Sequence, residues 1–449
     1  MELAVKKNSF TEGPILRRMI PFVLRVAATS ILQQLFTSAD MAIVGKFVSD
    51  SALAAVGCTG PLIGLFIEFF IGLSNSSNVI ISRHLGAGED DRAKRAMHTS
   101  LILALMAGIL VCIVGFCSAG ALLRVMSVPA DLLADSTLYL RIYFLCMPFF
   151  MVYNFTAAIF RSFGDTTRPL ICLSASGAIN VGLNILFILA FDMGIAGVAL
   201  ATVISNAIAC ISLLILLTRK SRPIRLIPKE ISFDKDIFTR ILKIGIPSGF
   251  LGSVFSISNV CMQSGINSLS TQAISASTAA SNIEIYIQFV GNAFANSTTT
   301  FIGHNYGAKE YQRCSKVLKT AILACVTVTA VLSAGVMLFS RPLLKIFVTE
   351  QAVITIALSR MKYTVVFKFV QAVMDILIGC MQGYGFTLVP ALISIFGVCG
   401  TRLVWLYAVF PHYRTLAAIM FIYPVTQAIA CLLLWISYLY VRKHRCKEV

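Results

Sequence analysis

Five polar residues in the first half of the chain could bind a proton or another small cation. Asp40 is an ionisable group within an otherwise apolar stretch, and Gln33 lies seven residues earlier, so a helix places both on one face. Asn180 and Asn184 share a face at a spacing of four, and Thr202 follows in the next apolar stretch. At ~1.5 Å per residue from the expected helix ends, these residues reach similar depths. The pattern predicts one polar pocket, although the asparagines and Thr202 could instead only hold helices together, and Asp40 could lie at the outer surface.

The second half has no counterpart of Asp40, because Cys261 occupies the corresponding position. Glu284 is the best second candidate for ion coupling, and Asp375 lies seven residues after Lys368, where the two could pair and neutralise each other. An aspartate at the centre of a membrane-spanning helix costs on the order of 2.5–3.5 kcal/mol, so such groups persist only when paired, hydrated or functional. The buried-looking charges outside the first pocket are Glu68, Glu284, Lys368, Asp375 and Arg402.

Composition shows which elements must position these groups. The 449 residues are 57% hydrophobic and only 13% charged, with a mean hydropathy of +0.84, whereas soluble domains carry roughly 25% charged residues. Apolar stretches of about 20 residues recur, and strand-like alternation is absent. The sequence therefore predicts an all-α integral membrane protein with twelve transmembrane helices, centred near residues 30, 63, 106, 148, 180, 206, 253, 288, 328, 369, 400 and 429.

The chain repeats itself with a shift of 221 residues. The segment 86–95 reappears at 307–316, and Gly164 and Pro169 correspond to Gly385 and Pro390. Gly86 and Gly307 are predicted to be helix C-caps, and Gly164 and Gly385 are expected in sharp turns. Two similar halves in an apolar chain are typical of secondary transporters.

The basic linker 219–243 separates an N-terminal lobe, 1–218, from a C-terminal lobe, 244–449. Each lobe is predicted to hold six spans. Because six spans return the chain to its starting side, we expect a pseudo-twofold axis along the membrane normal.

The net charge of +17 is concentrated in alternate connections and both termini, which is the positive-inside pattern of a plasma-membrane protein and not a nucleic-acid footprint. It predicts that both termini are cytoplasmic. The first apolar run is too long for a cleavable signal peptide.

Catalytic and metal-binding signatures are missing from the sequence. There is no Walker A motif, no Ser-His-Asp order, no ligand-spaced histidine pair and no paired cysteine spacing. We therefore expect no enzyme activity, metal or cofactor, and we expect a monomer that draws energy from a proton or sodium gradient.

Several segments in register resemble the multidrug and toxic compound extrusion (MATE) family. The segment around Asp40 and the one that ends at Gly57 are similar to the family's N-terminal signature. The remaining matches are Leu85-Gly86-Ala87-Gly88, Phe160-Arg161-Ser162-Phe163-Gly164-Asp165 and their second-half copies, so the resemblance covers essentially the whole chain.

The resemblance implies a central cavity and the export of cationic or amphipathic compounds against proton or sodium entry. It also implies that Asp40 is the coupling acid, assisted by Gln33, Asn180 and Thr202. Two departures favour proton coupling: Asn184 replaces an aspartate found in many members, and Gln371 stands where sodium-coupled members often have an acid, one turn before Asp375. A lipid-linked saccharide flippase and a non-transporting sensor or scaffold are the alternatives.

Overall fold

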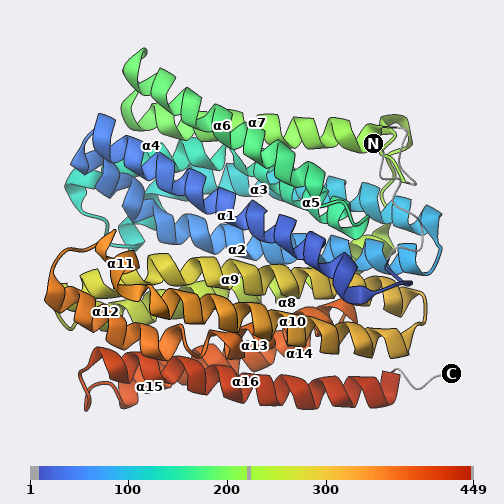
Figure 1. Ribbon diagram of the computed structural model, residues 1–449. Helices are drawn as coiled ribbons and strands as arrows, with labels where there is room; N and C mark the ends of the chain where they lie inside the picture. Colours follow the sequence, from blue (N-terminus) through green and yellow to red (C-terminus); the bar gives the residue numbers. More distant parts are fainter. Residues whose placement is uncertain (1–9, 220–223, 446–449) are drawn as a thin grey trace. The chain divides into compact units, whose positions relative to one another are not determined.

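The protein is all-α in the residues that the structure, a computed structural model, describes, which are 10–219 and 224–445 (Figure 1). The expected fold class is confirmed. The α-helices are α1 (Ile15–Phe47), α2 (Asp50–Gly86), α3 (Asp90–Val125), α4 (Ala130–Phe144), α5 (Met147–Ser162), α6 (Thr167–Leu189), α7 (Gly194–Thr218), α8 (Lys235–Asn267), α9 (Thr271–Gly307), α10 (Tyr311–Leu338), α11 (Ser340–Lys345), α12 (Gln351–Thr364), α13 (Lys368–Gly383), α14 (Leu388–Ser394), α15 (Thr401–Ala408) and α16 (Leu416–Arg445). A π-helix at Ile395–Gly400 joins α14 to α15, and a short 3₁₀ helix at Pro228–Glu230 precedes α8.

Most helices have the length and composition of membrane spans. Within the described residues, nine segments are long and apolar enough to cross a membrane, and two bent pairs bring the number to eleven. The pairs are α4 with α5, bent by 46°, and α12 with α13, bent by 43°. The expected span centred near residue 288 corresponds to α9, which has 37 residues but is too polar to meet the same criterion.

The helix boundaries follow the 221-residue repeat. Asp50 and Gly86 bound α2, and Thr271 and Gly307, each 221 residues later, bound α9. The helices α5 and α13 are related by the same shift at both ends. Ser49 and Ser270 cap α2 and α9 alike, each accepting a hydrogen bond from the backbone N–H three residues on, at 3.0 and 3.1 Å.

The chain divides into two compact units, and α1 and α8 contribute to both. The first unit contains residues 28–219 and 224–245, and the second contains residues 10–27 and 246–445. Each unit has its own apolar core. Ile237 and Ile241 of α8 are buried in the core of the first unit, whereas Met19 and Val23 of α1 are buried in that of the second.

Polar contacts hold the segment before α8 to the first unit. Lys94 forms an ion pair with Glu230, and the backbone N–H of Asp234 donates to Thr99 Oγ1 at 3.1 Å. The hydrogen bond and charge of Lys94 hold the pKa of the exposed Glu230 carboxyl below its ordinary value. Part of the predicted linker, from residue 224 on, therefore packs on the first unit.

The corresponding segment before α1 is bound within the second unit. Arg313 donates from Nη2 to the carbonyl oxygens of Glu12 and Gly13, at 2.9 and 2.7 Å. The Phe10 ring stacks on His304, with centroids 4.3 Å apart.

The expectation that Gly86 and Gly307 are helix C-caps was wrong for the turn after α2 and for its repeat after α9. Gly86 and Gly307 are the last helical residues, not the caps, and the left-handed conformation falls two residues later, at Gly88 (φ 74°) and Lys309 (φ 61°). The sharp turns expected at Gly164 and Gly385 are confirmed, with φ of 80° and 72°.

Candidate functional site

Asp40 of α1 is hydrogen-bonded to Asn184 of α6 inside the first unit. Asn184 Nδ2 donates to Asp40 Oδ1 at 2.6 Å, and it also lies 3.4 Å from Asn180 Oδ1. Asn180 and Asn184 are both buried, and Asp40 is partly buried. The structure therefore brings together three of the five residues that the sequence placed in this pocket.

The other two residues make no hydrogen bond to these three within the described part of the chain. The Thr202 hydroxyl donates to the Val198 carbonyl of its own helix at 3.1 Å. The side chain of Gln33 is half-buried and makes no hydrogen bond to the other four within the described part of the chain. A shared depth was therefore not enough for Thr202 or Gln33 to form a hydrogen bond with Asp40 in the described residues.

Two tyrosines of α4 were not foreseen as neighbours of Asp40. The phenol groups of Tyr139 and Tyr143 interact electrostatically with the Asp40 carboxyl, and their rings stack with centroids 6.1 Å apart. Their spacing of four residues in an apolar helix was the available signal, because it puts both rings on one face.

Close packing between α1 and α6 fixes the position of Asp40 along the helix axis relative to Asn184. A Cβ on Gly177 would lie 1.9 Å from Cε2 of Phe36, so the ring occupies the space that any larger residue would need. Phe36 is one turn before Asp40 on α1, and Gly177 is one turn before Asn180. The contact therefore sets which turn of α1 faces the two asparagines.

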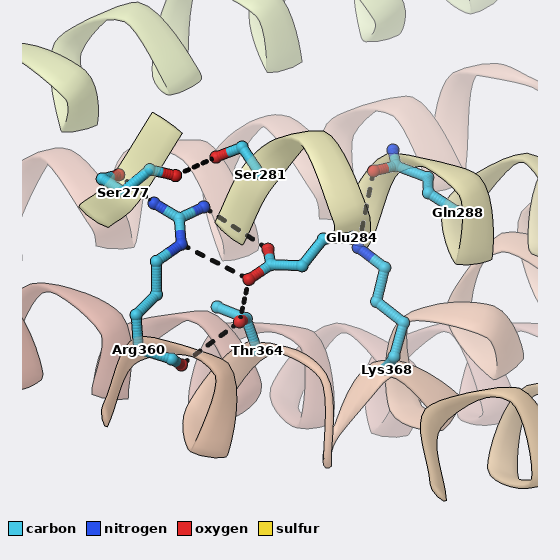
Figure 2. A network of polar contacts seen from close by, with 7 residues as sticks. All are labelled: Ser277, Ser281, Glu284, Gln288, Arg360, Thr364 and Lys368. Atoms are coloured by element: carbon cyan, nitrogen blue, oxygen red, sulfur yellow. Dashed lines mark hydrogen bonds and ion pairs between the residues drawn. The ribbon is translucent and has the colours of Figure 1, made fainter. Parts of the chain in front are cut away.

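A second buried polar cluster lies within the second unit, between α9 and the bent pair of α12 and α13 (Figure 2). Glu284 accepts from Arg360 Nε and Nη2, each at 3.4 Å, and from the Thr364 hydroxyl at 2.5 Å. Arg360 also donates to the Ser277 hydroxyl. Glu284, Arg360 and Thr364 are only 7, 8 and 9% exposed, so this is a buried and satisfied ion pair.

Arg360 was missed in the sequence. Arg360 lies in the last turns of α12. In the sequence alone, an arginine near the end of a helix cannot be told from a basic residue of the following connection. Only knowledge of which helix face meets α9 identifies it as the partner of Glu284.

The remaining charges of the second unit do not form the pair that the sequence suggested. Within the described residues, Lys368 and Asp375 are not an ion pair; Lys368 Nζ lies 3.5 Å from Gln288 Oε1 instead. Lys368 interacts with Asp375 through its charge and not through a hydrogen bond. Gln371 makes no side-chain hydrogen bond in the described part. Arg402, 2% exposed, lies over the Tyr423 ring at 4.1 Å from its centroid.

Many apolar helices, with buried charges inside each unit, define a multi-pass integral membrane protein. The sequence model of the MatE family matches residues 26–186 and 247–408, one segment in each half. The chain belongs to this family of transporters, as its resemblance in sequence had indicated.

Two similar proteins are named for multidrug resistance or multidrug export. The chain is 27% identical to the probable multidrug resistance protein YoeA of Bacillus subtilis, over 99% of this chain and 97% of the relative. It is 21% identical to the multidrug export protein MepA of Staphylococcus aureus, over 92% of this chain and 95% of that protein.

Solved structures share the fold over the whole chain. A MATE structure in complex with MaL6 has a TM-score of 0.91 at 21% identity, covering 100% of both chains. A MOP superfamily transporter from Pyrococcus furiosus, described as having a binding pocket of reverse polarity, has a TM-score of 0.90 at 21% identity, also covering 100% of both chains.

Proposed function

We propose that this protein is a secondary active antiporter that exports small cationic or amphipathic compounds in exchange for protons. The observation that carries the proposal is the hydrogen bond between Asp40 and Asn184, which joins an ionisable group to a second helix inside the first unit. An ionisable residue within a membrane-spanning helix is costly and marks an ion pathway. The names of the relatives support multidrug export as the transport activity.

The chemistry of Asn184 suits a group that gains and loses a proton. Ionised Asp40 only accepts hydrogen bonds, and Asn184 Nδ2 supplies one. Protonated Asp40 can also donate, and Asn184 Oδ1 is a buried acceptor that has no hydrogen-bond partner among the described residues. The amide can thus bind either protonation state after rotation, so protonation changes the contact between α1 and α6 without breaking it.

Coupling to protons rather than sodium is supported by the residue type at position 184. Asn184, the hydrogen-bond partner of Asp40, cannot ionise, so this contact brings one carboxylate and not two to a cation. In the second unit the Glu284 carboxylate is already bound by Arg360 and Thr364. The proposal therefore assigns ion coupling to the first unit.

In the transport cycle, protonation of Asp40 from outside changes its bonding with α6, shrinks the polar pocket and releases substrate outward; deprotonation inward resets it. The protein exposes its substrate site to each side of the membrane in turn through movement of two lobes, 1–218 and 244–449, which the linker 219–243 joins. It acts as a monomer in the plasma membrane, with both termini in the cytoplasm. The chain's own groups hold the ion, so no further cofactor is needed.

Ethidium efflux from proteoliposomes tests this proposal, with a proton gradient and a sodium gradient imposed separately. We expect efflux under the proton gradient alone, and loss of that efflux in Asp40→Asn. Asp50→Asn, which changes an exposed aspartate at the start of α2, is the matched control and should transport normally. Retained efflux in Asp40→Asn would contradict the assignment, and wild-type efflux under neither gradient would favour a lipid-linked saccharide flippase.

A further inference from the structure

The polar cluster of the second unit lies at the break in a bent span. The helices α12 and α13 meet at 43°, with three residues, 365–367, between Thr364 and Lys368. The helix α9 runs uninterrupted beside both of them. One face of α9 therefore passes from the end of α12 to the start of α13.

Side chains from that face of α9 hold both arms of the bend (Figure 2). Ser277 and Glu284 bind Arg360, and Glu284 also binds Thr364, so they hold the last turns of α12. Gln288, one turn further along α9, accepts from Lys368, the first residue of α13. Residues 277, 281, 284 and 288 have helical spacing, which gives one continuous polar strip. The break is thus bridged from outside by a single rigid helix.

The first unit has an equivalent break but, in the part that the structure describes, no equivalent polar strip. Its helices α4 and α5 meet at 46°. The 221-residue repeat places Tyr139 and Tyr143 at the positions of Arg360 and Thr364, and Ile63 and Ile67 at those of Glu284 and Gln288. Ile63 and Tyr143 pack there against apolar neighbours. Apolar contacts are non-directional and tolerate sliding, whereas a buried ion pair has a fixed geometry.

We propose that Ser277, Glu284, Gln288, Arg360, Thr364 and Lys368 form a clasp that fixes the bend between α12 and α13, and that the unclasped bend between α4 and α5 is free to change its angle. The protein then has one rigid bent span and one adjustable bent span, each at the same place in its unit. The adjustable span carries Tyr139 and Tyr143, the neighbours of Asp40. This inference concerns the helices alone and does not depend on which ion or substrate is exchanged.

Pulsed electron–electron spin resonance on the purified full chain tests the clasp. One label pair, at Thr355 of α12 and Leu388 at the start of α14, both exposed, brackets the bend between α12 and α13; the equivalent pair, at Ala134 of α4 and Thr167 at the start of α6, brackets the bend between α4 and α5. A ketone-bearing amino acid should carry the labels, because the chain has 13 cysteines. We expect a narrow distance distribution for the second-unit pair and one at least twice as wide for the first-unit pair.

Variants then separate the clasp from general packing. Arg360→Met should widen the second-unit distribution to match the first and leave the first-unit pair unchanged. Lys362→Met, at an exposed lysine of the same helix, should alter neither. If Arg360→Met does not fold, Lys368→Met removes the contact to Gln288 and a positive charge near Glu284 and Asp375, keeps the contacts of Arg360, and should give intermediate widening. Equal widths in the wild type, or narrow distributions in the folded variants, would overturn the proposal.

Discussion

Asn184 in α6 donates a hydrogen bond of 2.6 Å to the carboxylate of Asp40 in α1, 144 residues earlier in the chain. The same amide nitrogen lies 3.4 Å from Asn180 Oδ1, a longer and weaker contact. Asn184 is therefore the link between the ionisable group and the rest of α6. Within the described residues, Asn180 is hydrogen-bonded to Asn184 and not to Asp40.

Replacing Asn184 with leucine should impair transport strongly, because leucine has a similar size and neither donates nor accepts a hydrogen bond. Hydrogen bonds to charged groups contribute ~1.5–3 kcal/mol, so we expect the efflux rate to fall by roughly tenfold or more. Asn180→Leu should have a smaller effect. Initial rates of ethidium efflux from proteoliposomes, normalised to protein content, show which of the two variants loses more activity. A larger loss in Asn180→Leu than in Asn184→Leu would refute it.

A methyl group on Gly177 should displace α1 from α6. Its Cβ would lie 1.9 Å from Phe36 Cε2, and such overpacking costs about 1–3 kcal/mol. Thermal unfolding in detergent should show a lower Tm for Gly177→Ala and partial recovery when Phe36→Leu is added. Gly182→Ala is the matched control in the same helix, because its Cβ would meet nothing within 4 Å. That control should be neutral or stabilising, by up to ~1 kcal/mol; equal losses in both variants would argue against the packing explanation.

Much of this architecture could be predicted from the sequence because membrane helices are specified by long apolar runs and the two halves share one register. The contact between Asp40 and Asn184 could be anticipated because both residues are polar in apolar helices at compatible depths. Thr202 shows the limit of that argument. Its hydroxyl bonds to the Val198 carbonyl of its own helix, a local alternative that depth alone does not exclude.

Arg360 and the break after Thr364 show what a single sequence leaves open. Partner choice between helices depends on the rotation of each helix, and only the rotation of α12 that turns Arg360 toward α9 makes this arginine the partner of Glu284. The 43° bend also turns the start of α13 relative to α12, so spacing counted across residues 365–367 no longer follows one helical period.

Glu284 and Arg360 should show strong energetic coupling. Arg360→Met leaves a buried carboxylate without its counter-charge, which costs on the order of 3–5 kcal/mol. Adding Glu284→Gln removes that charge, so the double variant should be more stable than Arg360→Met alone. Unfolding followed by circular dichroism on the four proteins of the cycle measures the coupling. Additive losses would mean that the two side chains do not stabilise each other.

Lys309 holds a conformation that suits glycine better. Its φ of 61° matches the 74° of Gly88, 221 residues earlier, where the same turn is made by a residue without a Cβ. Left-handed backbone costs a non-glycine residue ~1–2 kcal/mol, part of which is offset by the greater freedom of glycine in the unfolded chain. Lys309→Gly should therefore stabilise the protein by about 0.5–1 kcal/mol. The reciprocal Gly88→Lys should destabilise it; because a Cβ at Gly88 would meet nothing within 4 Å, that loss would report backbone strain alone. Thermal melts of both variants test this pair, and a lower Tm for Lys309→Gly would show that the lysine side chain contributes more than its backbone costs.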